Sequence, residues 1–195
     1  MNTRTFFALI AIGLVSLLTG CATVAPPHEE PGVTAPSTYK GEAYYKNHLK
    51  DVIAKAETGD VASQYEVSFV LGWRGDIKSN FWLEKAAAQN YLPAVAMLGA
   101  RHFRYSTNGY SKDDAMAERL CYRAYEIYLS KPASEWDVFE TMMAAHSLRN
   151  IAEYHMSDKD KAQDLLCKAQ KMGVTEHNLV WTLNDDLKKI GRTCK

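Results

Sequence analysis

From Glu42 onward, the chain shows little of the alternation of hydrophobic and polar residues that strands need, and Ala, Leu, Met, Glu and Lys dominate. These residues favour helices. Three hydroxyl residues, Ser111, Ser134 and Ser157, each precede an acid by three positions, and they are spaced 23 residues apart both times. This is the pattern of a capped helix start. The sequence therefore predicts an all-α body of seven or eight helices, with short connections and antiparallel sequential neighbours.

An internal repeat is indicated by three similar segments. They are residues 82–90, residues 165–173 and, more weakly, residues 120–125. Each places a large apolar residue four positions before a small Ala, so both lie on the same helix face. The large side chain can pack against the adjacent helix, and the Ala leaves space for a side chain of that helix. Residues 90–99 extend the first copy, and residues 59–68 echo this extension 31 residues earlier. Helix pairs that stack on one another are expected from such a repeat.

These segments resemble the Sel-one-like repeat family, a branch of the tetratricopeptide-like solenoids. The family's Lys-Ala-Ala, Gly, Ala and Leu-Gly positions are matched by Lys85-Ala86-Ala87, by Asn90 in place of Gly, by Ala94 and by Leu98-Gly99. The acidic and aromatic positions upstream of these are matched by Asp76 or Asn80 with Trp82. In the next copy the same upstream positions are Asp113 and Ala117. The resemblance is good over residues 54–125 and fragmentary over 126–173. It departs from the family in a shortened loop between Gly75 and Phe81 and in a helix, 134–155, without a repeat signature. The resemblance implies a helix-turn-helix repeat array, an α-solenoid of two clear and one or two degenerate repeats. The alternative is an irregular helical bundle without repeat symmetry.

The first twenty residues have the features of a secretion signal. Arg4 precedes an apolar stretch over 6–18, which is shorter than the ~20 residues that span a bilayer. The following Leu18-Thr19-Gly20-Cys21 resembles the bacterial lipobox, which implies lipidation of Cys21 and cleavage before it. The alternative is a buried Cys after a hydrophobic helix. Because Ala22 and not Asp follows the Cys, the resemblance implies the periplasmic face of an outer membrane.

Residues 22–40 hold four of the six prolines and almost no large apolar residue. This composition is typical of a tether, which could reach about 60 Å if it were mostly polyproline-like. We therefore expect a signal peptide over 1–20, a lipidated Cys and Pro-rich disordered tether over 21–40, and a helical-repeat domain over 41–195.

The composition excludes several function classes. Lys and Arg number 23 against 23 Asp and Glu, which argues against nucleic-acid binding through bulk positive charge. The six histidines form no pair at helical three- or four-residue spacing, so no metal site is predicted. No nucleophile elbow or phosphate loop is found, and we expect no cofactor, no small-molecule substrate and no catalytic residue. The acidic pairs Asp113-Asp114 and Asp185-Asp186 are interpreted as first-turn charges and solvated faces.

Three cysteines remain after lipidation of Cys21. In an oxidising periplasm two of them are expected to pair, and Cys167 with Cys194 would close the last helix onto the one before it. Cys121 would then be a small buried hydrophobic residue. Sequence alone does not fix this connectivity.

Aromatic and basic residues at the ends of the repeat helices are the candidate partner-binding surface, because Tyr, Trp and Arg dominate interface hot spots. They are Trp73, Arg74, Arg101, Arg104, Tyr105 and Tyr110. Arg101 and Arg104 form a cationic stripe suited to an acidic partner. Tyr122, Tyr125 and Tyr128 recur every three positions, so at least one or two of them are expected to face inward.

Together these features predict a lipid-anchored, periplasm-facing module that binds a protein partner and catalyses no reaction. One use is an envelope scaffold or assembly factor. Another is an immunity protein that neutralises a periplasm-acting toxin such as a type VI lipase effector, a role that a small body with one standard interface could fill. A cell-wall or lipid hydrolase is a further alternative, which would need a catalytic Glu or His in a pocket.

Overall fold

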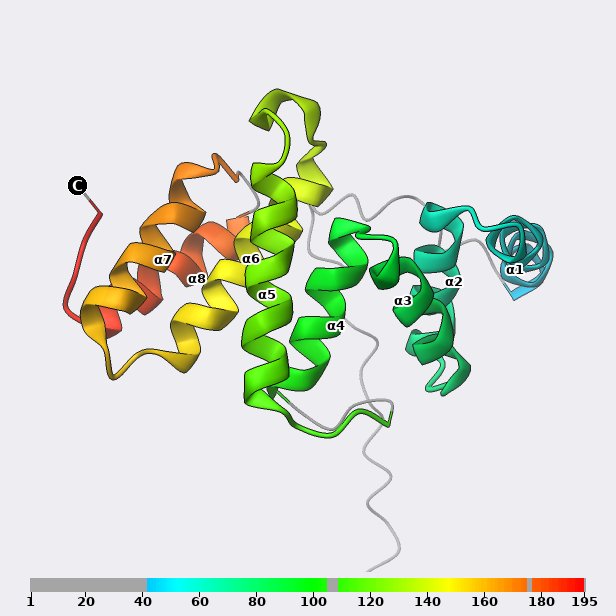
Figure 1. The fold of residues 1–195 in the computed structure, drawn as a ribbon, viewed down its shortest axis with the longest axis horizontal. Helices are drawn as coiled ribbons and strands as arrows, with labels where there is room; N and C mark the ends of the chain where they lie inside the picture. The colour runs from blue at the N-terminus through cyan, green and yellow to red at the C-terminus, as the bar shows by residue number, and fades with distance from the viewer. Residues whose placement is uncertain (1–41, 105–108, 175–176, 195) are drawn as a thin grey trace, which may run out of the picture. The chain divides into compact units, whose positions relative to one another are not determined.

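The computed structural model describes residues 42–104, 109–174 and 177–194. Within these ranges the chain forms eight α-helices and one 3-10 helix, η1, and no strand (Figure 1), so the predicted all-α fold is confirmed. The helices are α1 (Glu42–Glu57), α2 (Val61–Trp73), α3 (Lys78–Ala88), α4 (Leu92–Arg104), α5 (Asp114–Leu129), α6 (Val138–Tyr154), α7 (Lys159–Lys171) and α8 (His177–Lys189), with η1 at Ala133–Glu135. The predicted signal peptide, Cys21, the tether and Tyr105 lie outside the described residues.

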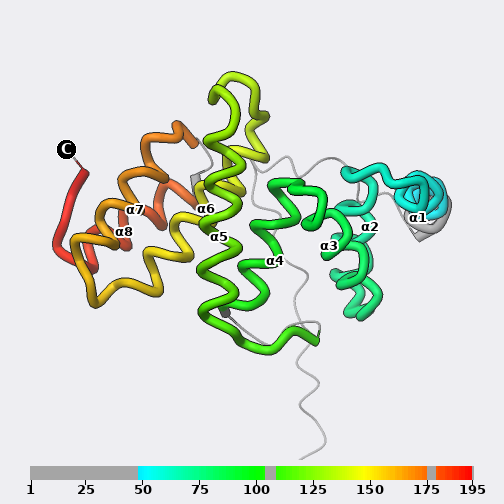
Figure 2. The backbone as a smooth tube through the Cα atoms, in the orientation of Figure 1, coloured from blue at the N-terminus to red at the C-terminus, as the bar shows by residue number. Residues whose placement is uncertain are grey.

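The helices pack in chain order within one compact unit, Gly41–Lys195. Each helix contacts the next, α4 also contacts α6, and α6 also contacts α8, as the backbone trace in Figure 2 allows the reader to follow. Three clusters of buried apolar side chains form the core, and they follow one another along the chain. One is centred on Val52 and Val67 of α1 and α2, one on Leu83, Leu92 and Val95, and one on Leu148, Leu166 and Leu183.

Aspartates, and not the serines identified in the sequence, cap three of the helices. The observed N-caps of α5, α6 and α7 are Asp113, Asp137 and Asp158, so the starts predicted at Ser111, Ser134 and Ser157 lie one to three residues too early. In each case the Asp carboxylate accepts a hydrogen bond from the backbone N–H three residues on. At α6 the full capping box is present, but it is formed by Asp137 and Glu140. A carboxylate also interacts favourably with the helix dipole, which a hydroxyl does not.

The alanines that the sequence comparison aligned share one environment. Ala86, Ala124 and Ala169 are all fully buried, and they lie on α3, α5 and α7. A Cβ placed on Gly99 of α4 would lie 2.8 Å from the Sγ of Cys121 on α5, closer than real contacts allow. The small residues of the repeat pattern therefore stand where neighbouring helices approach most closely.

The turn after α3 contains the only non-glycine residue with positive φ in the described part of the chain, Asn90, at φ +60°. Gly59 and Gly173, which follow α1 and α7, have φ of +99° and +73°. Asn is the non-glycine residue that best tolerates this conformation. The Oδ1 of Asn90 also accepts hydrogen bonds from the Nε, at 3.0 Å, and from the Nη2 of Arg123 on α5. Asn90 thus adopts the same left-handed conformation as Gly59 and Gly173, and it joins α5 to this turn.

Replacing Asn90 with Ala is expected to lower the free energy of unfolding by about 1–2 kcal/mol, because Ala is strained in the left-handed conformation. Asn90→Gly removes the same contact with Arg123 without the backbone strain, so it is the matched control and should be less destabilising. Urea unfolding followed by circular dichroism measures both. Equal losses for the two variants would contradict a role of the backbone conformation.

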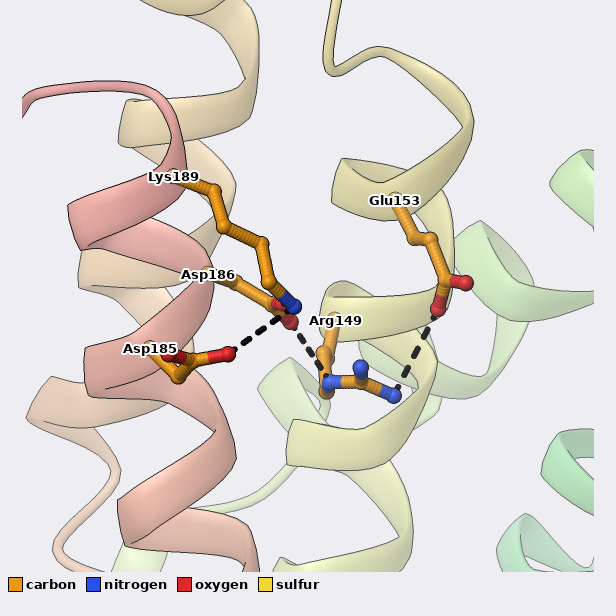
Figure 3. A network of polar contacts seen from close by, with 5 residues as sticks. All are labelled: Arg149, Glu153, Asp185, Asp186 and Lys189. Carbon is orange, nitrogen blue, oxygen red and sulfur yellow. Dashed lines mark hydrogen bonds and ion pairs between the residues drawn. The ribbon is translucent and has the colours of Figure 1, made fainter.

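A buried charge network joins α6 to α8 (Figure 3). The Nε of Arg149 lies 2.8 Å from the Oδ2 of Asp186, whose side chain is only 5 % exposed. Lys189 contacts Asp186 at 3.0 Å and Asp185 at 2.9 Å, and Arg149 also lies 3.5 Å from Glu153. The interpretation of Asp185-Asp186 as a solvated pair is therefore wrong for Asp186, because packing of α8 on α6 places its carboxylate against Arg149. Asp113, by contrast, is the N-cap of α5.

The chain's C-terminal segment is attached to α7. A disulfide joins Cys167 of α7 to Cys194, with Cα atoms 5.5 Å apart, and this is the pair expected from the sequence. Gln163 donates a hydrogen bond to the carbonyl oxygen of Thr193, and Arg192 pairs with Asp160 at 2.9 Å. Cys121 is a free, buried thiol, and burial raises its pKa to about 12.

Candidate functional site: an open groove between helix ends

An open groove of about 550 Å³ lies where the last turns of α3 and α5 meet the first turns of α2, α4 and α6. Its lining comes from α2, α4, α5 and α6 and from the α3–α4 and α5–α6 connections. The lining residues are Val61, Gln89, Asn90, Tyr91, Leu92, Arg123, Glu126, Ile127, Ser130, Lys131, Trp136 and Glu140. In Figure 1 the α3–α4 turn and the α5–α6 loop both lie toward the upper side of the view. The groove depends on the tight turn at Asn90, which positions Tyr91 and Leu92 at the start of α4.

Two aromatic rings in the groove are held by their neighbours. The indole Nε1–H of Trp136 donates a hydrogen bond to the backbone oxygen of Tyr128 at 2.8 Å, and the two rings stack with centroids 6.0 Å apart. Tyr91 packs edge-to-face on Tyr65 at 5.6 Å. Because each ring is fixed by a second residue, these lining side chains are preorganised for contact with a ligand.

The cations in the groove are already engaged, whereas its carboxylates retain free acceptor capacity. Arg123 is bound to Asn90, and the Nζ of Lys131 lies 4.6 Å from the centroid of the Trp136 ring. Glu140 accepts a long hydrogen bond, 3.3 Å, from the backbone of Asp137, and Glu126 makes no hydrogen bond or ion pair within the described residues. A carboxylate has about four acceptor positions, so both can accept further donors.

Three carboxylates act on the hydroxyl of Tyr91. Burial raises the pKa of this hydroxyl first, and the neighbouring carboxylates of Glu140, Asp137 and Asp60 raise it further. Asp60 and Asp137 are the N-caps of α2 and α6, so these charges come from helix starts that converge on the groove. The arrangement is suited to hold a cationic side chain between aromatic rings and carboxylates.

The residues predicted from the sequence do not form this groove. Trp73 and Arg74 are exposed at the end of α2. Arg101 is half-buried, because its Nη1 donates to the Oδ1 of Asn80 on α3 at 2.9 Å and its guanidinium lies over the ring of Tyr110 at 5.8 Å. Part of the Arg101 guanidinium is therefore occupied by contacts within the chain, and the predicted cationic stripe with Arg104 stays a prediction.

The remaining predicted residues have different outcomes. The hydroxyl of Tyr110 donates to the Oε1 of Glu84 at 2.8 Å, which ties the segment before α5 to α3. The side chain of Arg104 and all of Tyr105 lie outside the described residues. Tyr128 is buried and Tyr122 and Tyr125 are partly buried, which confirms that members of this set face inward.

Sequence reasoning missed Tyr91, Arg123, Glu126, Lys131, Trp136 and Glu140. One signal was present, because Asn90 in a glycine position marks a turn that exposes the next residue. Trp136 lies four residues after Pro132, near the end of the α5–α6 loop, but nothing local in the sequence indicates that this loop and the Asn90 turn share a groove.

Three of the histidines have polar contacts that can be named: His48 and His155 contact carboxylates, and His102 contacts the backbone oxygen of Ser111. The Nε2 of His155 lies 2.7 Å from the Oε1 of Glu118, and this hydrogen bond holds the pKa of Glu118 below its usual value. His48 contacts Glu66 in the same way at 2.6 Å. Among the described residues there is no cluster of three or more His, Cys, Asp or Glu side chains that could hold a metal ion.

Comparisons with models of protein families, with curated proteins and with solved structures found no match to this chain. In the part of the chain that the structure describes, no helix has both the length and the apolar character needed to cross a bilayer.

Proposed function

We propose that this chain is the body of a lipid-anchored protein of the periplasmic face of the outer membrane, and that it works as a protein-interaction module of Sel-one-like repeats. The lipobox at Cys21 supports the anchor. Support for the repeats comes from the buried alanines of α3, α5 and α7 and from the left-handed residues after α1, α3 and α7. The contacts of α4 with α6 and of α6 with α8 are those expected of stacked helix pairs.

The groove at Tyr91 and Trp136 is the observation that carries the proposal. Its two rings flank an open space, and Glu126 and Glu140 offer carboxylate oxygens there. An Arg or Lys side chain of a partner would place its apolar stem against Tyr91 and its charge beside the carboxylates. The partner is therefore a protein segment with a basic side chain. A basic partner is the opposite of the acidic partner that Arg101 and Arg104 predict.

Charge reversal in the groove tests this assignment. Glu126→Lys in the full-length chain is expected to weaken partner binding by about tenfold or more, because the introduced cation repels the basic segment. Tyr91→Ala should also weaken binding. The matched control is Asp51→Lys, an equally exposed charge reversal on α1, which should leave binding unchanged.

The measurement has two steps. Partners are captured from the producing cells with tagged full-length protein, and the affinity of the captured partner is then compared across the variants by calorimetry. Circular dichroism checks that each variant keeps its helices. Partner binding that tolerates both Glu126→Lys and Tyr91→Ala would show that the groove is not the site.

Two biological uses fit this module. The first is a scaffold or assembly factor of an envelope complex. The second is an immunity protein, and the small size of the compact unit Gly41–Lys195 favours it, because one standard interface of about 800 Å² per partner fits such a body. A single captured partner that is toxic in the periplasm and neutralised by this chain would establish the second use, and several resident envelope proteins would establish the first.

A further inference from the structure

Exposed apolar side chains gather at the corner between α2 and α3. Phe69 is 45 % exposed, Trp73 76 %, Ile77 66 % and Phe81 53 %. Nine large hydrophobic side chains are exposed in the described residues, and these four fall within one short stretch of chain. Such a concentration is characteristic of an interaction surface, whereas single exposed apolar residues are not.

The corner presents these side chains at its tip and one turn behind it. Trp73 ends α2 and Ile77 precedes α3, while Phe69 and Phe81 lie four residues further back on their helices. The rings of Phe69 and Trp73 have centroids 6.1 Å apart. The two helices bury other faces, including Val67 on α2, so the outward positions are left for the aromatic residues. Figure 1 shows the α2–α3 connection as a tight turn at the end of the two helices.

The charges beside this apolar corner are mainly positive. Arg74 and Lys78 are exposed and make no side-chain ion pair with any described residue, and the Nζ of Lys85 lies 4.5 Å from the centroid of the Phe81 ring. The carboxylate of Asp76 accepts a hydrogen bond from the backbone N–H of Lys78 at 2.9 Å and so serves the turn itself. The corner therefore combines a Trp, two Phe and an Ile with cations that lack acidic partners.

We propose that the α2–α3 corner docks on the surface of a bilayer that contains anionic lipids, with Trp73 and Ile77 entering the interface and Arg74 and Lys78 binding phosphate groups. Trp at the headgroup level with adjacent Lys and Arg is the composition of membrane-surface anchors. A corner with four apolar side chains is small for a stable protein interface. The inference adds to the proposed function and rests on it in one respect, because the lipid at Cys21 would keep the body near the membrane.

Quenching of tryptophan emission by brominated lipids tests this docking. The acylated full chain is placed in phosphatidylethanolamine vesicles with and without phosphatidylglycerol. We expect the brominated lipid to quench part of the emission in the vesicles with phosphatidylglycerol, and we expect that part to disappear in Trp73→Phe. Trp181 on α8 is 62 % exposed, so Trp181→Phe is the matched control and should keep the quenching.

A second measurement does not depend on the anchor. Cosedimentation of the Cys21→Ser full chain with the same vesicles should weaken by about tenfold in the Trp73→Ser, Ile77→Ser double variant and in Arg74→Glu, but not in Trp181→Ser. Neither vesicle assay involves binding of a protein partner in the groove. A negative result in these assays would therefore contradict the membrane docking of the α2–α3 corner without contradicting the proposed function. Quenching and cosedimentation that are the same in the corner variants as in the wild-type chain would overturn the proposal. So would loss of a protein partner in Trp73→Ser without any change in vesicle binding, because the corner would then belong to a protein interface.

Discussion

Replacing Arg149 with Ala is expected to lower the free energy of unfolding by about 3 kcal/mol, because the change leaves the buried carboxylate of Asp186 with only the exposed Lys189 as its cation. The side chains of Arg149 and Asp186 are only 12 % and 5 % exposed, and their ion pair joins α6 to α8. Lys189, the other partner of Asp186, is 58 % exposed and cannot replace the buried guanidinium. Urea unfolding at neutral pH, followed by circular dichroism, measures the loss.

An exposed ion pair of the same chain is the matched control for Arg149. Lys168 lies 2.7 Å from Asp164 on the surface of α7, and Lys168→Ala should cost less than about 1 kcal/mol. The double variant Arg149→Met, Asp186→Leu should recover most of the stability lost in Arg149→Ala, since it removes both buried charges together. If Arg149→Ala were no more destabilising than Lys168→Ala, the network in Figure 3 would have no structural role.

Removal of the disulfide is the second large effect. Cys194→Ser is expected to cost about 3 kcal/mol, because the bridge between residues 27 apart no longer restricts the unfolded chain. Cys167→Ser should cost nearly the same, since each variant breaks the same bond. Thermal unfolding with and without a reducing agent measures the effect.

The reducing agent supplies the control for this second prediction. It should lower the stability of the wild-type chain to the level of the two serine variants and leave the variants unchanged. If the reducing agent still lowered the stability of a serine variant, a different cysteine pair would be bonded. If the stability of the wild-type chain were the same with and without the reducing agent, the bridge would contribute no stability.

The sequence predicted the parts of this fold that depend on local spacing. The helix count and the small alanines at helix contacts both follow from residues within one or two turns of each other. The capped starts were located only to within three residues, because Ser and Asp both cap helices and lie close together before α5, α6 and α7.

The features that sequence reasoning missed are set by tertiary packing. Asp186 lies in a charged, helical stretch and is indistinguishable there from a surface acid, and only the packing of α8 on α6 brings Arg149 to it. The groove likewise combines the Asn90 turn with the α5–α6 loop, two connections that are distant in sequence. The contact of Arg101 with Asn80 was missed for a similar reason, because Asn80 belongs to the preceding helix.

The close approach of α4 and α5 at Gly99 also has a chemical consequence for the odd cysteine. Thiol–disulfide exchange needs a thiolate, and the Cys121 thiol is protonated at neutral pH because burial raises its pKa to about 12. Cys121 therefore cannot attack the Cys167–Cys194 bridge while α4 covers it. Both α4 and α6 cover this thiol, so its alkylation requires that the packing around α5 opens locally. The alkylation rate therefore measures that opening, and the wild-type chain contains its own probe of the motion.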